Sequence, residues 1–300
     1  MTRTTVRAAG VVTGWGRGLD VLPTDAHAVA AGRRVIEATP RPRAGDRLRR
    51  ATRECLLAVD AVDAMLEDGG LTRADVTGDG TALVYVTAAA YGASNRAFVE
   101  GGGRALHFPY TAPSAVPAEV AIEFALHGPY AVLIGGPATT VDALAHARTL
   151  LARGACARAL VLAVETFVEC ADLHARARWL VDRPLVEAAV AVLLEPGQGD
   201  ERLAPGATIA ENIEEGRAES TQRFAGGGLG GSVSCPPNPG GLGGSVSCAP
   251  NFIGETLACG PLIALALARA GAREELVLRG RWRGRETTLT LGVTGAARQP

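Results

Sequence analysis

Apolar and polar residues follow two patterns along the first 195 positions of the chain. In the first pattern, apolar residues recur every three or four positions, which predicts helices with one buried face over residues 48–68, 118–126 and 139–151. Strands that alternate with helices predict an α/β fold whose layers surround a mainly parallel sheet. Runs that are almost wholly apolar, typical of buried strands, occupy residues 6–13, 81–86, 130–134, 159–164 and 186–195.

The segment from residue 127 to residue 165 is predicted to form a strand, a tight turn, a long helix and a second strand. The sequence Gly-Gly-Pro forms the turn, and Thr139 or Thr140 can cap the helix that follows. Free N–H groups and the helix dipole favour an anion at such a helix N-terminus, and many enzymes place a nucleophile there. This chain has Pro137 at that point, which has no nucleophilic side chain.

The pattern changes after residue 215, where Gly, Ser and Pro dominate. The sequence GGLGGSVSC occurs at residues 227–235 and again at 240–248, and two copies are too few for a solenoid. We therefore expect three parts: residues 1–215, a Gly/Ser/Pro-rich loop with an internal duplication at 216–247, and residues 248–300.

The segments outside these elements are less regular. Residues 19–46 are expected to form a surface excursion, and three prolines make residues 108–117 irregular. A polar helix is expected over residues 167–179 and an apolar one over 253–270. The remaining apolar runs predict a strand from residue 208 and a closing hairpin of residues 275–279 and 287–293.

Composition narrows the choice of partners and cofactors. Hydrophobic residues make up 47% of the chain, and the formal net charge is −1 with no block of like charge, so nucleic acid and anionic membranes are poor partners. No apolar run reaches the roughly 20 residues of a membrane span. Six cysteines without a CxxC pair or a zinc-finger spacing indicate a reduced, cytoplasmic protein without metal. The GxGxG turn at residues 14–18 lacks the dinucleotide spacing, so we expect no cofactor.

Six segments, in order and spacing, resemble the β-ketoacyl synthase family. They include VRAAGVVTGWG near the start, RATRECLLAVDAVDAMLEDGGL, the stretch from FPYTAP to the closing Glu165, and RPLVEAAVAVLLE. SCAPNFIGETLACGPLIALALA and the final strand pair complete the set. The resemblance implies a thiolase-like α/β fold of five layers, αβαβα, built from two halves and normally dimeric, here with a shortened second half.

The resemblance also implies which residues should do the chemistry. The family condenses acyl chains on carrier proteins with a Cys at the helix N-terminus and two His residues. The alignment places Pro137 at the Cys position, and a one-residue slip would place Gly136 or Ala138 there. Glu255 stands at one His position, the segment with the other His is absent, and GRWRGRE at residues 280–286 replaces the family's last glycine-rich turn. We therefore expect no catalytic residue and no intrinsic activity; if active, the chain would be an acyltransferase of this type within a complex.

Inactive members of the family, the chain-length factors, pair with an active synthase and set its product length. By resemblance, we expect this chain to form a heterodimer with an active ketosynthase and, through it, to meet an acyl carrier protein in fatty-acid or type II polyketide biosynthesis. The candidates for the tunnel wall and the interface are Phe108, Tyr110, Phe124, Tyr130, Ile134 and Pro137. Ordinary packing in the core or in a loop is the alternative role for the bulky residues among them.

Two other functions stay open from the sequence. One is a free-standing protein or homodimer that holds an acyl or polyketide intermediate without turning it over. The other is a repurposed acyltransferase that uses residues outside the family pattern. Its reactive candidates are Cys259, Cys248, His107, His146 and Glu255, of which Cys259 also fits a core thiol and Glu255 a first-turn helix position.

Overall fold

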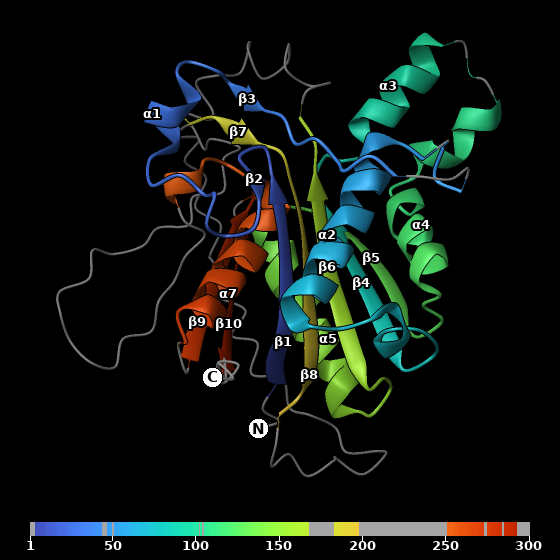
Figure 1. The fold of residues 1–300 in the computed structure, drawn as a ribbon, viewed down its shortest axis with the longest axis vertical. Coiled ribbons are helices and arrows are strands. Elements are labelled where there is room, and N and C mark those ends of the chain that lie inside the picture. The colour runs from blue at the N-terminus through green and yellow to red at the C-terminus, as the bar shows by residue number, and fades with distance from the viewer. Residues whose placement is uncertain are drawn as a thin grey trace, which may run out of the picture.

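A six-stranded sheet forms the centre of the computed structural model (Figure 1). The structure describes residues 4–43, 47–49, 51–101, 103, 105–167, 183–197, 251–272, 275–283 and 285–292. The helix expected over 167–179, the strand expected from 208 and the duplicated loop lie outside these residues, except for residue 167. The strand order is β2 (Gly16–Arg17), β1 (Thr4–Thr13), β8 (Ala188–Pro196), β6 (Arg158–Glu165), β4 (Thr81–Thr87), β5 (Tyr130–Ile134).

The sheet is mixed, so the prediction of a mainly parallel sheet is wrong. β4 pairs in parallel with β5 and with β6, whereas β8 pairs antiparallel with β6 and with β1, and β1 pairs antiparallel with β2. β6 and β8 are buried along almost their whole length. A strand that is covered on both faces is a continuous apolar run whatever the direction of its neighbours, so the apolar pattern alone could not give the direction.

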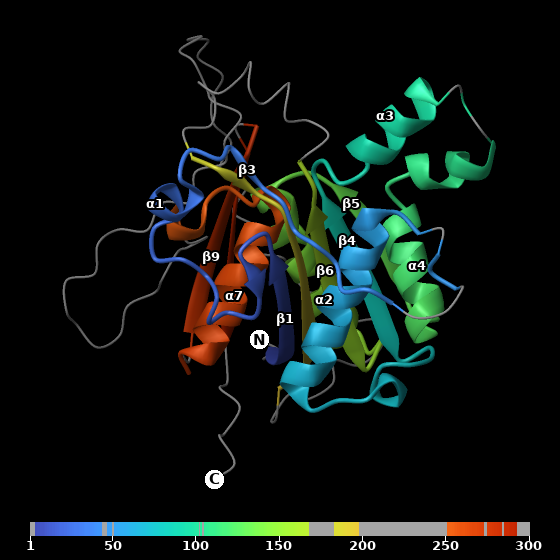
Figure 2. The same ribbon diagram turned by 45° about the horizontal axis from the view of Figure 1, so that its top comes forward.

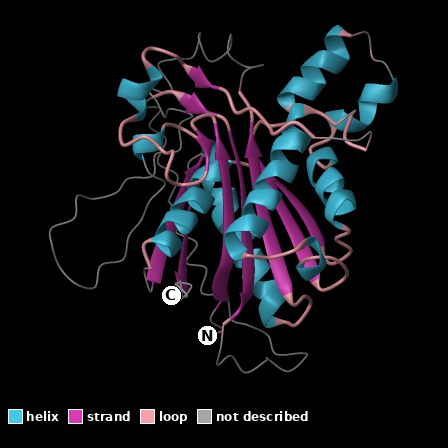
Figure 3. Ribbon diagram, viewed as in Figure 1, coloured by secondary structure: helices cyan, strands magenta, loops and turns pink. Residues whose placement is uncertain are grey.

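Helices cover both faces of the sheet. α2 (Arg53–Gly69) and α4 (Ala115–Phe124) pack on one face, and α5 (Pro137–Ala152) and α7 (Gly260–Ala270) pack on the other (Figures 1 and 3). The hairpin of β9 (Glu275–Trp282) and β10 (Arg285–Gly292) packs on the far side of α5 and α7 through Leu276, Leu278, Leu289 and Leu291. These α, β, α and β layers agree with the thiolase-like fold and make up four of the five expected layers among the described residues, the second sheet having two strands.

The closing hairpin is apolar on one side and polar on the other. The leucines of both strands point inward and are buried, whereas Arg279, Arg281, Thr288 and Thr290 point outward and are exposed. A strand pair with one solvated face shows this period-two alternation, which fits the shortened second half.

β5 lies at the edge of the sheet, because β4 is its only neighbour. Tyr130 is 48% exposed and Ile134 is 49% exposed. The expectation of a buried strand at 130–134 is therefore wrong. An apolar run of five residues fits a strand, but it carries no information on whether a second neighbour covers that strand.

The smaller elements adjust the predicted boundaries. The expected surface excursion at 19–46 contains α1 (Ala26–Ala30) and β3 (Val35–Ile36), which pairs with β7 (Leu185–Val186) and buries Ile36. α2 and α4 start at 53 and 115 rather than 48 and 118. The helix expected at 253–270 is divided into 3-10 turns and α7. The remaining elements are η1 (Arg73–Asp75), α3 (Gly92–Glu100), which projects beyond the sheet in Figure 2, η2 (Ala105–Thr111), η4 (Asn251–Ile253) and η5 (Leu257–Cys259).

No helix in the described part of the chain is both long and apolar enough to cross a bilayer.

Candidate functional site

The N-terminus of α5 is the centre of the candidate site. The helix begins at Pro137, with Gly136 as its N-cap, so neither Thr139 nor Thr140 is the cap. A proline suits the first helical position because no N–H group is needed there. Thr140 has a different role: its buried hydroxyl donates a hydrogen bond to the carbonyl of Ala258, at 2.7 Å. The start of α5 is thereby tied to η5.

Strand β9 closes this helix N-terminus. A Cβ atom on Gly136 would overlap the indole ring of Trp282, and a Cβ atom on Gly280 would overlap the Pro137 carbonyl and the Ala138 nitrogen. The two glycines therefore allow the strand and the first turn of the helix to lie in direct contact. Trp282 was not among the residues predicted for the site, although it lies in the segment 280–286 that stands in place of the family's last glycine-rich turn.

Glu165 ends β6 and gathers backbone N–H groups from two other segments. Its carboxyl group accepts hydrogen bonds from the nitrogens of Ala88 at 2.6 Å, Ala89 at 2.9 Å and Ala258 at 3.3 Å. Complete burial raises the pKa of Glu165 to about 8, although these hydrogen bonds act in the opposite direction. The group joins β6, the end of β4 and η5 beside the start of α5.

Glu255 lies close to this cluster but not in a helix. It precedes η5, and its carboxylate accepts a hydrogen bond from the nitrogen of Leu257 at 2.9 Å. Arg183 lies 3.9 Å from the other carboxylate oxygen, and the Val186 nitrogen donates to the Glu255 carbonyl. The expectation of a first-turn position is thus wrong for Glu255, which caps a short turn and holds that turn against β7.

Among the described residues, the other reactive candidates do not bring a reactive thiol or imidazole to the α5 N-terminus. Cys259 is fully buried and donates to the Ala188 carbonyl at 3.4 Å. Burial, and then the neighbouring Glu165, raise the pKa of the Cys259 thiol well above its usual range, which disfavours the reactive thiolate. His146 is exposed on α5. Cys248 and the side chain of His107 lie outside the part of the chain that the structure describes.

The tunnel and interface candidates fall into two groups. Phe124 is in the core, under the guanidinium of Arg73 at 4.9 Å from the ring centroid, and Tyr110 packs against the same core. Phe108 is 64% exposed. Its ring lies 5.7 Å from the ring of Phe98 on α3, whereas Tyr130 and Ile134 are half exposed on the edge strand β5. Only Pro137 of the six lies at the α5 N-terminus.

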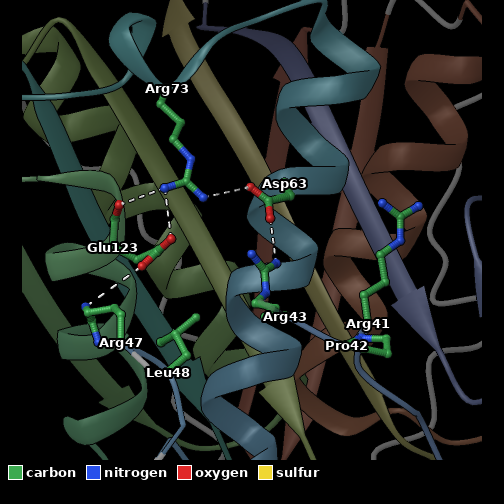
Figure 4. A pocket seen from close by; sticks show the side chains of 8 residues that line it. All are labelled: Arg41, Pro42, Arg43, Arg47, Leu48, Asp63, Arg73 and Glu123. Carbon is green, nitrogen blue, oxygen red and sulfur yellow. Dashed lines mark hydrogen bonds and ion pairs between the residues drawn. The ribbon is translucent and has the colours of Figure 1, made fainter. Parts of the chain in front are cut away.

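A separate polar cavity of about 380 Å³ lies over α2 and α4 (Figure 4). An alternating chain of charges runs along it: Arg43 to Asp63 at 2.5 Å, Asp63 to Arg73 at 3.8 Å, and Arg73 to Glu123 at 2.8 Å. The arginines of this cavity thus have carboxylates of the chain as partners. We interpret the network as a tie between the segment before α2 and the helices below it. The lining residues are Arg41, Pro42, Arg43, Arg47, Leu48, Asp63, Arg73 and Glu123.

Among the described residues, no three His, Cys, Asp or Glu side chains are grouped so that they could hold a metal ion. The residues that meet at the α5 N-terminus are a proline, a tryptophan, a threonine that bonds to a backbone carbonyl, and a buried carboxyl group. This set ties the segments of the fold to one another: the threonine hydroxyl is hydrogen-bonded to the Ala258 carbonyl, and the Glu165 carboxyl group accepts backbone N–H groups.

The fold defines a thiolase-like chain whose helix α5 begins with Pro137. Residues 41–184 match the family model of the β-ketoacyl synthase N-terminal domain. The expected resemblance to β-ketoacyl synthases is therefore confirmed, and the chain has their fold. A search of curated proteins finds no match.

Solved structures of ketosynthases share the fold of this chain. A complex of a type II polyketide acyl-carrier protein with its ketosynthase, AntDE:AntF, aligns with a TM-score of 0.68 and 10% identity over 98% of this chain and 100% of that one. A β-ketoacyl synthase from Burkholderia phymatum aligns with a TM-score of 0.67 and 13% identity, over 97% of this chain and 99% of that one. The ishigamide ketosynthase/chain length factor gives 0.62 and 17%, over 96% and 98%. An alignment with a Streptomyces albus ketosynthase domain spans 48% of that chain.

Proposed function

We propose that this chain is a non-catalytic partner, similar to a chain length factor, that pairs with an active β-ketoacyl synthase and shapes its acyl or polyketide tunnel. A carrier protein would meet the pair through the synthase, in the cytoplasm, during fatty-acid or type II polyketide synthesis. The α5 N-terminus supports this role, because Pro137 stands where the family has its nucleophile and Trp282 covers the position.

The observation that carries the proposal is the open, apolar edge of the sheet. β5 leaves one side without a strand partner in the described chain, and its Tyr130 and Ile134 are half exposed. Val99, Phe108 and Ile122, which are 76%, 64% and 65% exposed, come from α3, η2 and α4 at the same end of the sheet (Figures 1 and 2). Large exposed apolar surface and an open strand edge both favour association with another chain.

The names of the similar structures support the choice of partner. One of them is described as a ketosynthase/chain length factor and another as a ketosynthase with its acyl-carrier protein. The repurposed-enzyme alternative gains no support from Cys259 or Glu255, since the first is a buried thiol and the second caps a turn.

Co-expression with the ketosynthase of the same gene cluster tests the proposal. We expect a co-purifying complex with the mass of one copy of each chain, measured by light scattering. Tyr130→Asp/Ile134→Asp should abolish co-purification, because two buried, unpaired carboxylates would then face the partner. Val29→Asp is the matched control, since Val29 is an exposed apolar residue (52%) on α1, away from β5.

Two results would contradict the proposal. One is a well-behaved monomer that does not bind the synthase. The other is equal co-purification of the wild type and the β5 variant. A stable homodimer that ignores the synthase would favour the free-standing binding protein instead.

A further inference from the structure

The wall of the polar cavity over α2 and α4 carries more positive than negative charge. The cavity volume of about 380 Å³ falls within the range of small-molecule sites, about 300 to 1,000 Å³. Positive charge that is gathered in a concave site attracts anions. Among the described residues, four arginines and two carboxylates line the cavity: Arg41, Arg43, Arg47, Arg73, Asp63 and Glu123.

The two carboxylates of the wall use only part of the hydrogen-bonding capacity of the arginines. Each guanidinium group has five N–H donors. Arg43 meets Asp63 through Nη2 at 2.5 Å, and Arg73 meets Glu123 through Nη1 at 2.8 Å. Nη2 of Arg73 lies 3.8 Å from Asp63, which is too long for a hydrogen bond (Figure 4). Because the Arg73 side chain is half exposed, an acceptor that enters from solvent can reach its remaining donors.

Arg47 brings a third guanidinium group to the same wall. Its Nη1 pairs with Glu119 at 2.6 Å, and its Nε lies 3.9 Å from Glu123, again too far for a hydrogen bond. Glu119 does not line the cavity. The three arginines come from two places in the chain, since Arg43 and Arg47 precede α2 and Arg73 begins η1. One anion between them would therefore connect separate segments of the fold.

A phosphate group suits this arrangement better than a carboxylate group does. Guanidinium groups pair with phosphate through two parallel hydrogen bonds. The tetrahedral phosphate presents oxygen atoms in several directions, so one group can accept from arginines on different segments, whereas a planar carboxylate has two oxygen atoms. Pro42 and Leu48 also line the cavity and provide apolar surface for the organic part of a ligand.

We propose that this cavity binds a small phosphate-bearing molecule, with Arg43, Arg47 and Arg73 as the phosphate-binding residues. The site is separate from the α5 N-terminus, because α2 and α4 pack on one face of the sheet and α5 packs on the other. The ion pairs with Asp63 and Glu123 hold the guanidinium groups in place before the ligand arrives, and they also compete with it for donors.

Isothermal titration calorimetry of the full chain with inorganic pyrophosphate tests the proposal at an ionic strength held constant with KCl. We expect saturable binding of one pyrophosphate per chain, a rise in Tm with ligand concentration, and weaker binding as KCl is added. Malonate, a dicarboxylate of similar size, should bind more weakly. Arg43→Gln should weaken pyrophosphate binding about tenfold, because a charge-assisted hydrogen bond is lost.

Two further variants separate an anion site from a network that only ties the fold. Asp63→Asn should tighten pyrophosphate binding, because it removes a carboxylate that competes for Arg43 and Arg73. Arg285→Gln is the matched control: Arg285 also pairs with a carboxylate, Asp142 at 2.9 Å, but it lies on β10 beyond α5, so binding should not change.

The measurement on the wild type does not depend on how well the variants fold. The proposal is overturned if the wild type does not bind pyrophosphate, or if malonate binds as tightly. It is also overturned if Asp63→Asn weakens binding, or if Arg285→Gln weakens it as much as Arg43→Gln does.

Discussion

At the scale of single residues, the contact between Gly136 and Trp282 is the main feature of the α5 N-terminus. The site of attack in condensing relatives is a helix N-terminus that substrate must reach. Here an indole ring occupies the space in front of that N-terminus, and the absence of two Cβ atoms permits it. The first turn of α5 is therefore in close contact with β9.

This contact gives a prediction about stability. Gly136→Ala should lower the free energy of unfolding by about 1 to 3 kcal/mol, because the added methyl group overpacks against the ring. The loss should largely disappear in a Trp282→Ala background, where the ring is absent. Urea unfolding of the single and double variants measures both values.

Gly80→Ala is the control for the glycine effect itself. A Cβ atom there would lie 3.8 Å from the Cβ of Ala157, an ordinary contact, so little stability should be lost. If Gly136→Ala cost the same with and without Trp282, the proposed packing against the indole would be wrong.

The turn before α5 could be predicted from the sequence, but the contact of Trp282 with this turn could not. The Gly-Gly-Pro turn and the helix after it are local features, although the helix begins at Pro137 and not after a cap at Thr139 or Thr140. Trp282 follows Gly136 by almost half the chain. Its contact depends on how the closing hairpin packs on α5, and no local pattern reports that packing.

At the scale of elements, Glu165 joins three segments that are distant in sequence. Its carboxyl group accepts N–H groups from the end of β4 and from η5, while it lies at the end of β6. Because burial raises its pKa to about 8 in the fold, above the ordinary 4.5, the folded chain binds this proton more tightly than the unfolded chain does.

This difference sets the direction of a pH effect. The contribution of the group to stability is complete below about pH 4.5 and is lost as the pH rises to about 8, by up to about 1.4 kcal/mol per pH unit. Glu165→Gln, which stays neutral, should remove this slope. Unfolding free energies measured from mildly acidic to mildly alkaline pH test it.

Glu187 provides the opposite reference. Burial favours a raised pKa at Glu187, but hydrogen bonds from Arg53 and from the nitrogens of Phe167 and Ala38 outweigh it and lower the pKa. Its contribution is lost as the pH falls, so Glu187→Gln should leave the slope between pH 4.5 and 8 in place. Equal slopes for wild type and Glu165→Gln would contradict the role of Glu165.

The positions of most helices and strands could be predicted from local patterns, but which strands lie next to one another, and in which direction, could not. The cores of β1, β4, β6 and β8 and of helices α2 and α5 lie where apolar runs and spacings predicted them. The open edge at β5 and the antiparallel pairing of β8 were missed. Strand order and direction arise from pairing between distant segments, which the period of one segment does not encode.

At the scale of the whole molecule, the chain joins a six-stranded sheet to a second sheet of two described strands. One side ends in an open apolar edge at β5, and the β9–β10 hairpin lies on the opposite side (Figure 1). The division into residues 1–215, 216–247 and 248–300 stays a prediction, since its middle part lies outside the described residues. A partner at β5 would cover the open edge. Obligate interfaces commonly bury more than about 2,000 Å² of surface.

The central claim is that this chain contributes shape and not chemistry. The most direct test is a reconstituted condensation assay with the ketosynthase of the same gene cluster and its carrier protein. We predict no turnover of acyl-carrier thioester by this chain alone, and a change in activity or product length when it is added to the synthase. Turnover by the chain alone, or identical products from the synthase with and without it, would contradict the account.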